Sequence, residues 1–119
     1  MEKDLLANLV QIQGQLKVLH WQTESYAEHK AFGETYDALE EKIDEIIEVY
    51  SGKYERPKFG GVRSITFADY SNLKIDSFLE AFEDYMNNTF LSQKDSELAN
   101  IKDEVVAIIQ KLKYLLTLK

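Results

Sequence analysis

The sequence predicts an all-α protein, a four-helix bundle in which two antiparallel helical hairpins are joined by a long crossover. Three observations support this fold class. Apolar residues recur at intervals of three and four along four separate stretches of the chain. The 119 residues include one proline and five glycines, and four of these six helix breakers lie between Gly52 and Gly61. This clustering leaves long stretches of the chain free of helix breakers, which favours long helices.

Length and composition predict one domain over residues 1–119. With 45% hydrophobic and 29% charged residues, the chain is long enough to form a single hydrophobic core. The net charge of −7 disfavours binding to nucleic acid, because that affinity comes from clustered cations. The absence of cysteine excludes disulfides, thiolate metal sites and a cysteine nucleophile. No stretch of about 18 apolar residues and no secretion signal is present, so we expect no membrane span and a cytoplasmic location.

The first two helices are predicted over residues 3–24 and 27–51. The apolar stripe of the first consists of Leu5, Leu9, Ile12, Leu16 and Leu19. The stripe of the second consists of Phe32, Tyr36, Leu39, Ile43, Ile46 and Tyr50. Ser25 and Glu28 have the spacing of a capping box that opens the second helix. Because only a few residues separate the stripes, the two helices must form an antiparallel hairpin.

The second half of the chain begins with a segment, Ser51 to Asn72, in which the periodicity is lost. A third helix is predicted over residues 74–90 with Asp76 as its N-cap, and a fourth over residues 93–118 with Ser92 or Asp95 as its N-cap. The crossover of roughly 20 residues has room for at most a short helix. Two hairpins joined in this way have the topology of ferritin-like bundles, whereas an up-and-down bundle needs three short loops.

Four residues of the first hairpin are candidates for metal binding. His20 lies four residues after Leu16 and is expected on the apolar face, where an imidazole needs a hydrogen-bond partner or a metal ion. Asp44 and Glu48 are spaced i, i+4, which places two carboxylates on one helix face. A hydrogen-bonded core histidine and a solvated acidic face are the alternative interpretations. His29 is the only other histidine.

Helix geometry separates these residues within one chain. His29 and Asp44 are fifteen residues apart in one predicted helix, and a rise of 1.5 Å per residue places them about 22 Å apart. In an antiparallel hairpin, His20 faces the low thirties of the second helix and is also well away from Asp44. A site that combines both pairs therefore needs two chains. If two copies pack antiparallel about a two-fold axis, the histidine end of one hairpin meets the acidic end of the other.

This pattern resembles the signature of the Dps miniferritins. The residues that carry the resemblance are Leu19, His20, Trp21, His29, Phe32, Tyr36, Asp44 and Glu48. It implies a homo-oligomer with iron sites at two-fold interfaces, where His20 and His29 of one subunit and Asp44 and Glu48 of the other bind iron. It also implies ferroxidase-like activity, in which peroxide or oxygen oxidises the bound iron.

Two features differ from that family's pattern and favour a rival interpretation. The interval between the two histidines is nine residues, about three shorter than the family's usual spacing. Gly33 stands where the family has an additional aspartate, and the nearby acidic residues that are able to replace it are Glu24, Glu28 and Glu34. The rival is a non-enzymatic bundle that serves in protein binding or as a structural oligomer. The chain also lacks the basic N-terminal tail that binds DNA in such proteins.

Two further observations remain open. The chain resembles a family of small proteins encoded by large tailed phages and found in marine sequence collections, through segments 20–23, 26–30 and 95–98; this resemblance implies no activity. The crossover is basic in an acidic chain, and either it binds an anionic partner or its cations pair with acidic helices of the same chain. The cations are Lys53, Arg56, Lys58 and Arg63.

Overall fold

The computed structural model describes residues 4–88 and 95–118. The helices are α1 (Leu5–Gln22), α2 (Tyr26–Lys53), the short 3₁₀ helix η1 (Tyr70–Asn72), α3 (Ile75–Asn88) and α4 (Ser96–Leu115). The described residues contain no strand. The predicted fold class, an all-α four-helix bundle, is therefore confirmed.

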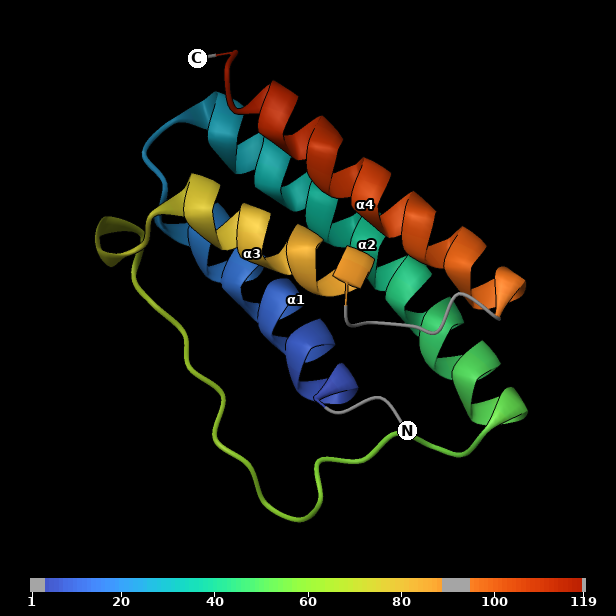
Figure 1. Ribbon diagram of the computed structural model, residues 1–119. Coiled ribbons are helices and arrows are strands. Elements are labelled where there is room, and N and C mark those ends of the chain that lie inside the picture. Colours follow the sequence, from blue (N-terminus) through green and yellow to red (C-terminus); the bar gives the residue numbers. More distant parts are fainter. Residues whose placement is uncertain (1–3, 89–94, 119) are drawn as a thin grey trace.

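The helices form two antiparallel hairpins, one of α1 and α2 and one of α3 and α4 (Figure 1). Helix α2 packs against both α1 and α4, and α4 also packs against α3. The crossover between α2 and η1 has no regular secondary structure and runs back beside α1, where η1 makes its contacts. One side of the α1–α2 hairpin therefore packs against the rest of the bundle, and part of its remaining surface is exposed to solvent.

The helix ends agree with the predictions to within one to three residues wherever both lie in the described part of the chain. The prediction of Asp76 as an N-cap is wrong, because Asp76 lies inside the first turn of α3. Asp95 does occupy the N-cap position of α4, but its side chain makes no capping hydrogen bond. It pairs instead with Lys53 at 2.7 Å and accepts a hydrogen bond from the hydroxyl of Tyr54. Ser92 lies outside the described residues.

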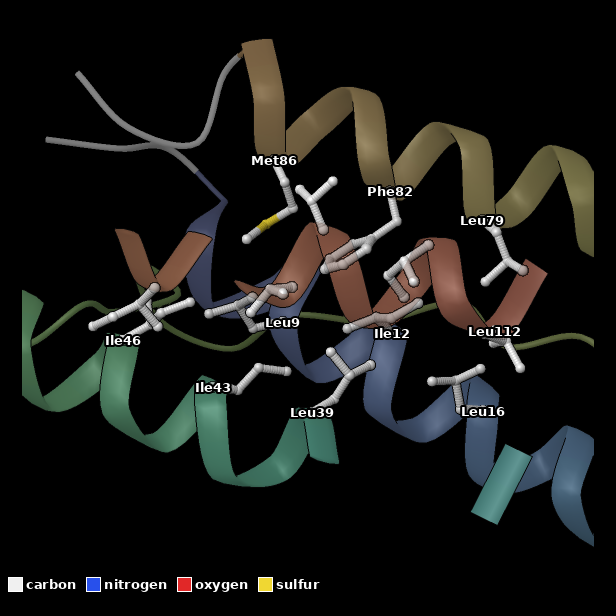
Figure 2. Close-up of a cluster of buried hydrophobic side chains, with 14 of the residues drawn as sticks. Leu9, Ile12, Leu16, Leu39, Ile43, Ile46, Leu79, Phe82, Met86 and Leu112 are labelled. Atoms are coloured by element: carbon white, nitrogen blue, oxygen red, sulfur yellow. The ribbon is translucent and has the colours of Figure 1, made fainter. Parts of the chain in front are cut away.

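The predicted apolar stripes form the core. Figure 2 shows side chains from all four helices meeting there: Leu9, Ile12, Leu16, Leu39, Ile43, Ile46, Leu79, Phe82, Met86 and Leu112. Each fully buried side chain of this size contributes about 1.5–3 kcal/mol relative to an exposed one. In α4, the apolar repeat of the sequence includes Ile108, which is half-buried, whereas the adjacent Ile109 is fully buried. The apolar face of α4 is therefore wider than that repeat.

Three glutamines along one face of α1 hold the crossover, and we call them the glutamine row: Gln11, Gln15 and Gln22. Gln15 donates from Nε2 to the carbonyl of Ala68 at 2.9 Å and accepts from the amide of Ala68 at 2.9 Å. Gln11 donates to another backbone carbonyl of the crossover at 3.0 Å. Gln22 accepts from the amide of Tyr70 at 2.7 Å. The row thereby places η1 beside the turn between α1 and α2.

Candidate metal centre

The turn between α1 and α2 is short and tightly hydrogen-bonded. Thr23 follows the last residue of α1 and donates its amide to the carbonyl of Leu19 at 3.0 Å. Ser25 is the N-cap of α2, and its Oγ accepts from the amide of Glu28 at 3.2 Å. This half of the predicted capping box is confirmed. The turn brings the last turn of α1 and the first turn of α2 side by side.

The other half of the capping box does not form. The carboxylate of Glu28 accepts hydrogen bonds from the hydroxyls of Thr23 and Tyr70, both at 2.7 Å, while the amide of Ser25 donates to Thr23 Oγ1 at 3.1 Å. Glu28 is only 9% exposed. The hydrogen bond to Glu28, followed by burial, raises the pKa of Tyr70 above its ordinary value. The carboxylate of Glu28 therefore ties the turn and the crossover together.

His20 and His29 bind each other's backbone across this turn. Nδ1 of His20 donates to the carbonyl of His29 at 2.6 Å, and Nδ1 of His29 donates to the carbonyl of His20 at 2.8 Å. The two rings are stacked, with centroids 3.9 Å apart and planes 15° apart. We call this pair, with its two reciprocal hydrogen bonds, the imidazole clasp. It brings together two of the four residues that the sequence singled out.

The clasp determines which nitrogen of each ring carries the proton. A carbonyl oxygen only accepts, so in a neutral imidazole each Nδ1 is protonated and each Nε2 keeps a free lone pair. Neither Nε2 has a hydrogen-bond partner within the described residues. The carbonyl of His20 is also one of the last four of α1, which have no partner inside the helix, so His29 caps α1.

His20 lies at the edge of the bundle instead of on its apolar face. The buried residue in this turn of α1 is Leu19, and His20 is half-buried while His29 is exposed. The difference arises because the ring turns toward the carbonyl of His29 and leaves the core. The bonding expected for a core histidine is therefore present, but at the surface of the hairpin.

Asp44 and Glu48 both lie on the exposed face of α2. Neither forms an ion pair within the part of the chain that the structure describes. Because α2 is continuous from residue 26 to 53, His29 and Asp44 are about 22 Å apart along its axis. Among residues 4–88 and 95–118, no group of three or more histidine or acidic side chains is arranged to hold a metal ion. One chain thus carries two separate pairs, as the helix geometry predicts.

Three further aromatic side chains, two of them well exposed, lie on the same hairpin as the clasp. Trp21 is 68% exposed and Tyr26 is 76% exposed, and the ring of Tyr26 lies 6.4 Å from that of His29. The ammonium of Lys17 lies 4.4 Å from the ring centroid of Tyr36 and 5.8 Å from that of Trp21. We call Trp21, Tyr26 and Tyr36 the aromatic patch. Phe32 and Tyr36 both belong to the predicted apolar stripe of the second helix, and Phe32 is fully buried, whereas Tyr36 is only half-buried.

The basic crossover is in part tied to acidic residues of the same chain. Lys53 pairs with two carboxylates at the start of α4, at 2.7 and 2.5 Å, and Arg63 pairs with Asp4 at 2.5 Å. These contacts confirm the intramolecular interpretation for two of the four cations. Arg56 and Lys58 form no ion pair within the described residues.

The fold and the clasp define a small helical bundle whose distinguishing feature is a histidine-linked hairpin. The chain matches, over residues 20–116, a protein family described as a family of unknown function (DUF5856), and it belongs to that family. The match begins at His20 and includes the clasp, the acidic pair and all of α4. No curated protein and no solved structure matches the chain. None of the helices, within the described residues, is long and apolar enough to cross a membrane.

Proposed function

We propose that this protein is a Dps-like homo-oligomer that binds iron at a site shared by two chains. His20 and His29 of one chain and Asp44 and Glu48 of a second chain supply the ligands. The observation that carries the proposal is the imidazole clasp. Histidines that bind metals commonly donate the other ring N–H to a carbonyl, which fixes the tautomer and the ring orientation. Both histidines make such a bond here.

The donor set suits a borderline divalent cation. Two imidazole nitrogens and two carboxylates are ligands that Fe(II) and Zn(II) both accept, and the chain has no thiolate to favour a softer ion. Asp44 and Glu48 are exposed and, in the described part of the chain, form no ion pair with a lysine or arginine that metal binding has to break. Bound Fe(II) is the substrate: each ion gives up one electron, so two ions reduce one hydrogen peroxide, with two protons, to two waters.

The spacing along α2 defines how two chains would meet. The midpoint between His29 and Asp44 lies between Tyr36 and Asp37. If two copies of α2 pack antiparallel about a two-fold axis at this point, His29 of each chain faces Asp44 of the other. The same register sets Gly33 opposite Glu40. A histidine end then meets an acidic end twice, once on each side of the axis.

The aromatic patch supports a second candidate function, binding of another protein without catalysis. Trp21 and Tyr26 are large and well exposed, and such residues are enriched in protein interfaces. In this case the clasp only stabilises the hairpin. Metal binding separates the two functions, because the second needs none.

The test is a titration with Fe(II) under anaerobic conditions, followed by peroxide and measurement of ferric absorbance. His29→Ala and Asp44→Ala should each abolish the signal, whereas Glu41→Ala, which removes an exposed carboxylate one turn away, should leave it unchanged. The absence of binding of both Fe(II) and Zn(II) to the unmodified protein would rule out the metal function.

Mixing two defective variants tests whether the site is shared. One variant carries His20→Ala and His29→Ala, and the other carries Asp44→Ala and Glu48→Ala. A mixed dimer has one intact site, so random exchange of chains should restore about a quarter of the normal binding, since half of the dimers are mixed. No recovery after exchange, with mixed dimers demonstrated by mass, would show that the four residues do not form a shared site.

A further inference from the structure

Gly33 lies in the middle of α2, where glycine is the poorest helix former after proline. Its backbone does not explain the choice, because the positive φ angles among the glycines belong to Gly60 and Gly61. The surroundings of its Cα do explain it. A Cβ placed on Gly33 would lie 2.8 Å from Cε1 of His20, closer than real Cβ atoms approach, and 3.0 Å from Nδ1 of the same ring, which is a tight contact. The ring of His20 occupies the space that any other side chain would need.

We infer that Gly33 is the positioning residue of the imidazole clasp. The missing side chain lets the edge of the His20 ring lie against the backbone of α2, where Nδ1 reaches the carbonyl of His29. Because an imidazole is rigid, this contact also sets the direction of Nε2, which lies 3.7 Å from the same Cβ position. A side chain at position 33 would displace the ring and stand beside Nε2.

The two other helical glycines show that this role is specific. A Cβ on Gly52, near the end of α2, meets nothing within 4 Å. A Cβ on Gly14 meets the ring of Phe67, which belongs to the crossover and not to the clasp. Gly52→Ala is therefore a control on the same helix, with the same substitution and no steric contact.

Stability measurements on a double-mutant cycle test the inference. Alanine favours a helix over glycine, so Gly52→Ala should raise the melting temperature. Gly33→Ala should lower it in the unmodified protein and raise it in the His20→Ala background, where the ring is gone. An increase in both backgrounds would overturn the inference, and so would an equal decrease in both.

A spectroscopic readout separates positioning from a general loss of stability. In the unmodified protein, nitrogen NMR of the imidazoles should show a protonated Nδ1 on both His20 and His29. In folded Gly33→Ala, His20 should lose the hydrogen-bonded Nδ1–H signal, and His29 should lose the shift caused by ring stacking. Unchanged signals from both rings in the variant would refute the positioning role even if the melting temperature falls.

The metal-binding consequence rests on the proposed function. With Zn(II) as the probe, Gly33→Ala should weaken binding at least about tenfold, the loss typical when the groups that orient a ligand are removed, whereas Gly52→Ala should leave it unchanged. If the unmodified protein binds no Zn(II), the proposed function fails, but the stability cycle and the imidazole spectra still decide the role of Gly33. If Zn(II) binds equally well to Gly33→Ala, the positioning role in the metal site is refuted.

Discussion

Gln15 and Ala68 are joined by two hydrogen bonds although they are 53 residues apart in the chain. The side-chain amide of Gln15 pairs with the amide and the carbonyl of Ala68 in the way that a neighbouring strand would. Gln15 is only 2% exposed, so its polar atoms have few other partners. Two residues after Ala68, the hydroxyl of Tyr70 donates a hydrogen bond to the carboxylate of Glu28 in the first turn of α2. The crossover is thereby coupled to the hairpin that carries the clasp.

Replacing Gln15 by glutamate should loosen the crossover. The carboxylate keeps the shape of the amide but has no N–H to donate, so it faces the carbonyl of Ala68 without a hydrogen bond. The free energy of unfolding in urea should fall by about 1–3 kcal/mol. Gln11 makes a single, exposed hydrogen bond to the crossover, so Gln11→Glu should lower the free energy of unfolding by less. Equal losses for the two variants would show that burial of the Gln15 pair is unimportant.

Tyr70 should contribute stability that is lost at alkaline pH. Its pKa is raised above 10.0 in the folded protein, first by the hydrogen bond to Glu28 and then by burial. A raised pKa means that the contribution is complete below the ordinary value and is lost as the pH rises through the folded value. Tyr70→Phe should cost about 0.5–1.5 kcal/mol at neutral pH and reduce the alkaline loss.

Urea denaturation at neutral and alkaline pH, with ultraviolet titration of tyrosinate, measures both effects. Tyr26→Phe is the control, because Tyr26 is 76% exposed. If Tyr70→Phe and the unmodified protein lose stability equally as the pH rises, the hydrogen bond to Glu28 is not the cause.

The ion pair between Glu83 and Lys113 should protect the α3–α4 hairpin above acidic pH. Nζ of Lys113 and Oε1 of Glu83 lie 2.9 Å apart, and the hydrogen bond from Lys113 lowers the pKa of Glu83 below 4.5. A lowered pKa gives stability that is complete above the ordinary value and is lost as the pH falls through the folded value. Glu83→Gln should cost on the order of 1 kcal/mol at neutral pH and flatten the acid limb of the stability curve.

Thermal unfolding followed from neutral to acidic pH checks this expectation. Asp84→Asn removes a neighbouring exposed carboxylate of α3 and should leave the acid limb unchanged. A steep acid limb that persists in Glu83→Gln would assign the acid sensitivity to other carboxylates.

The sequence predicted the helices well because burial is periodic. The first stripe, with Leu5, Leu9 and Leu19, is buried as predicted, since a repeat of three and four leaves one face for the core. The same logic placed His29 and Asp44 too far apart to meet within one chain. Both results depend only on the rise and the turn of a helix.

Helical periodicity could not predict the imidazole clasp or the glutamine row. Periodicity says which face a residue occupies, but the bond from His20 to His29 depends on the length of the turn and on the space left by Gly33. The pairing of Gln15 with Ala68 depends on a long-range path that no local pattern encodes. The shortened turn and the glycine were visible in the sequence, but only as departures from a family pattern.

The proposed dimer predicts where two copies of α2 cross. A two-fold axis between Tyr36 and Asp37 brings Asp37 of one chain next to Asp37 of the other. The two copies of Glu41 are then about 13 Å apart, measured along the helix axis of α2. The chain has no cysteine, so single-cysteine variants give unambiguous cross-links. Under mild oxidation, Asp37→Cys should form a disulfide-linked dimer and Glu41→Cys should not, because a disulfide needs Cα atoms within about 7 Å. Non-reducing electrophoresis measures the yield. Equal yields from the two variants would indicate random collision, and a dimer linked only through Glu41→Cys would move the axis away from the point at which the histidines face the acidic pair.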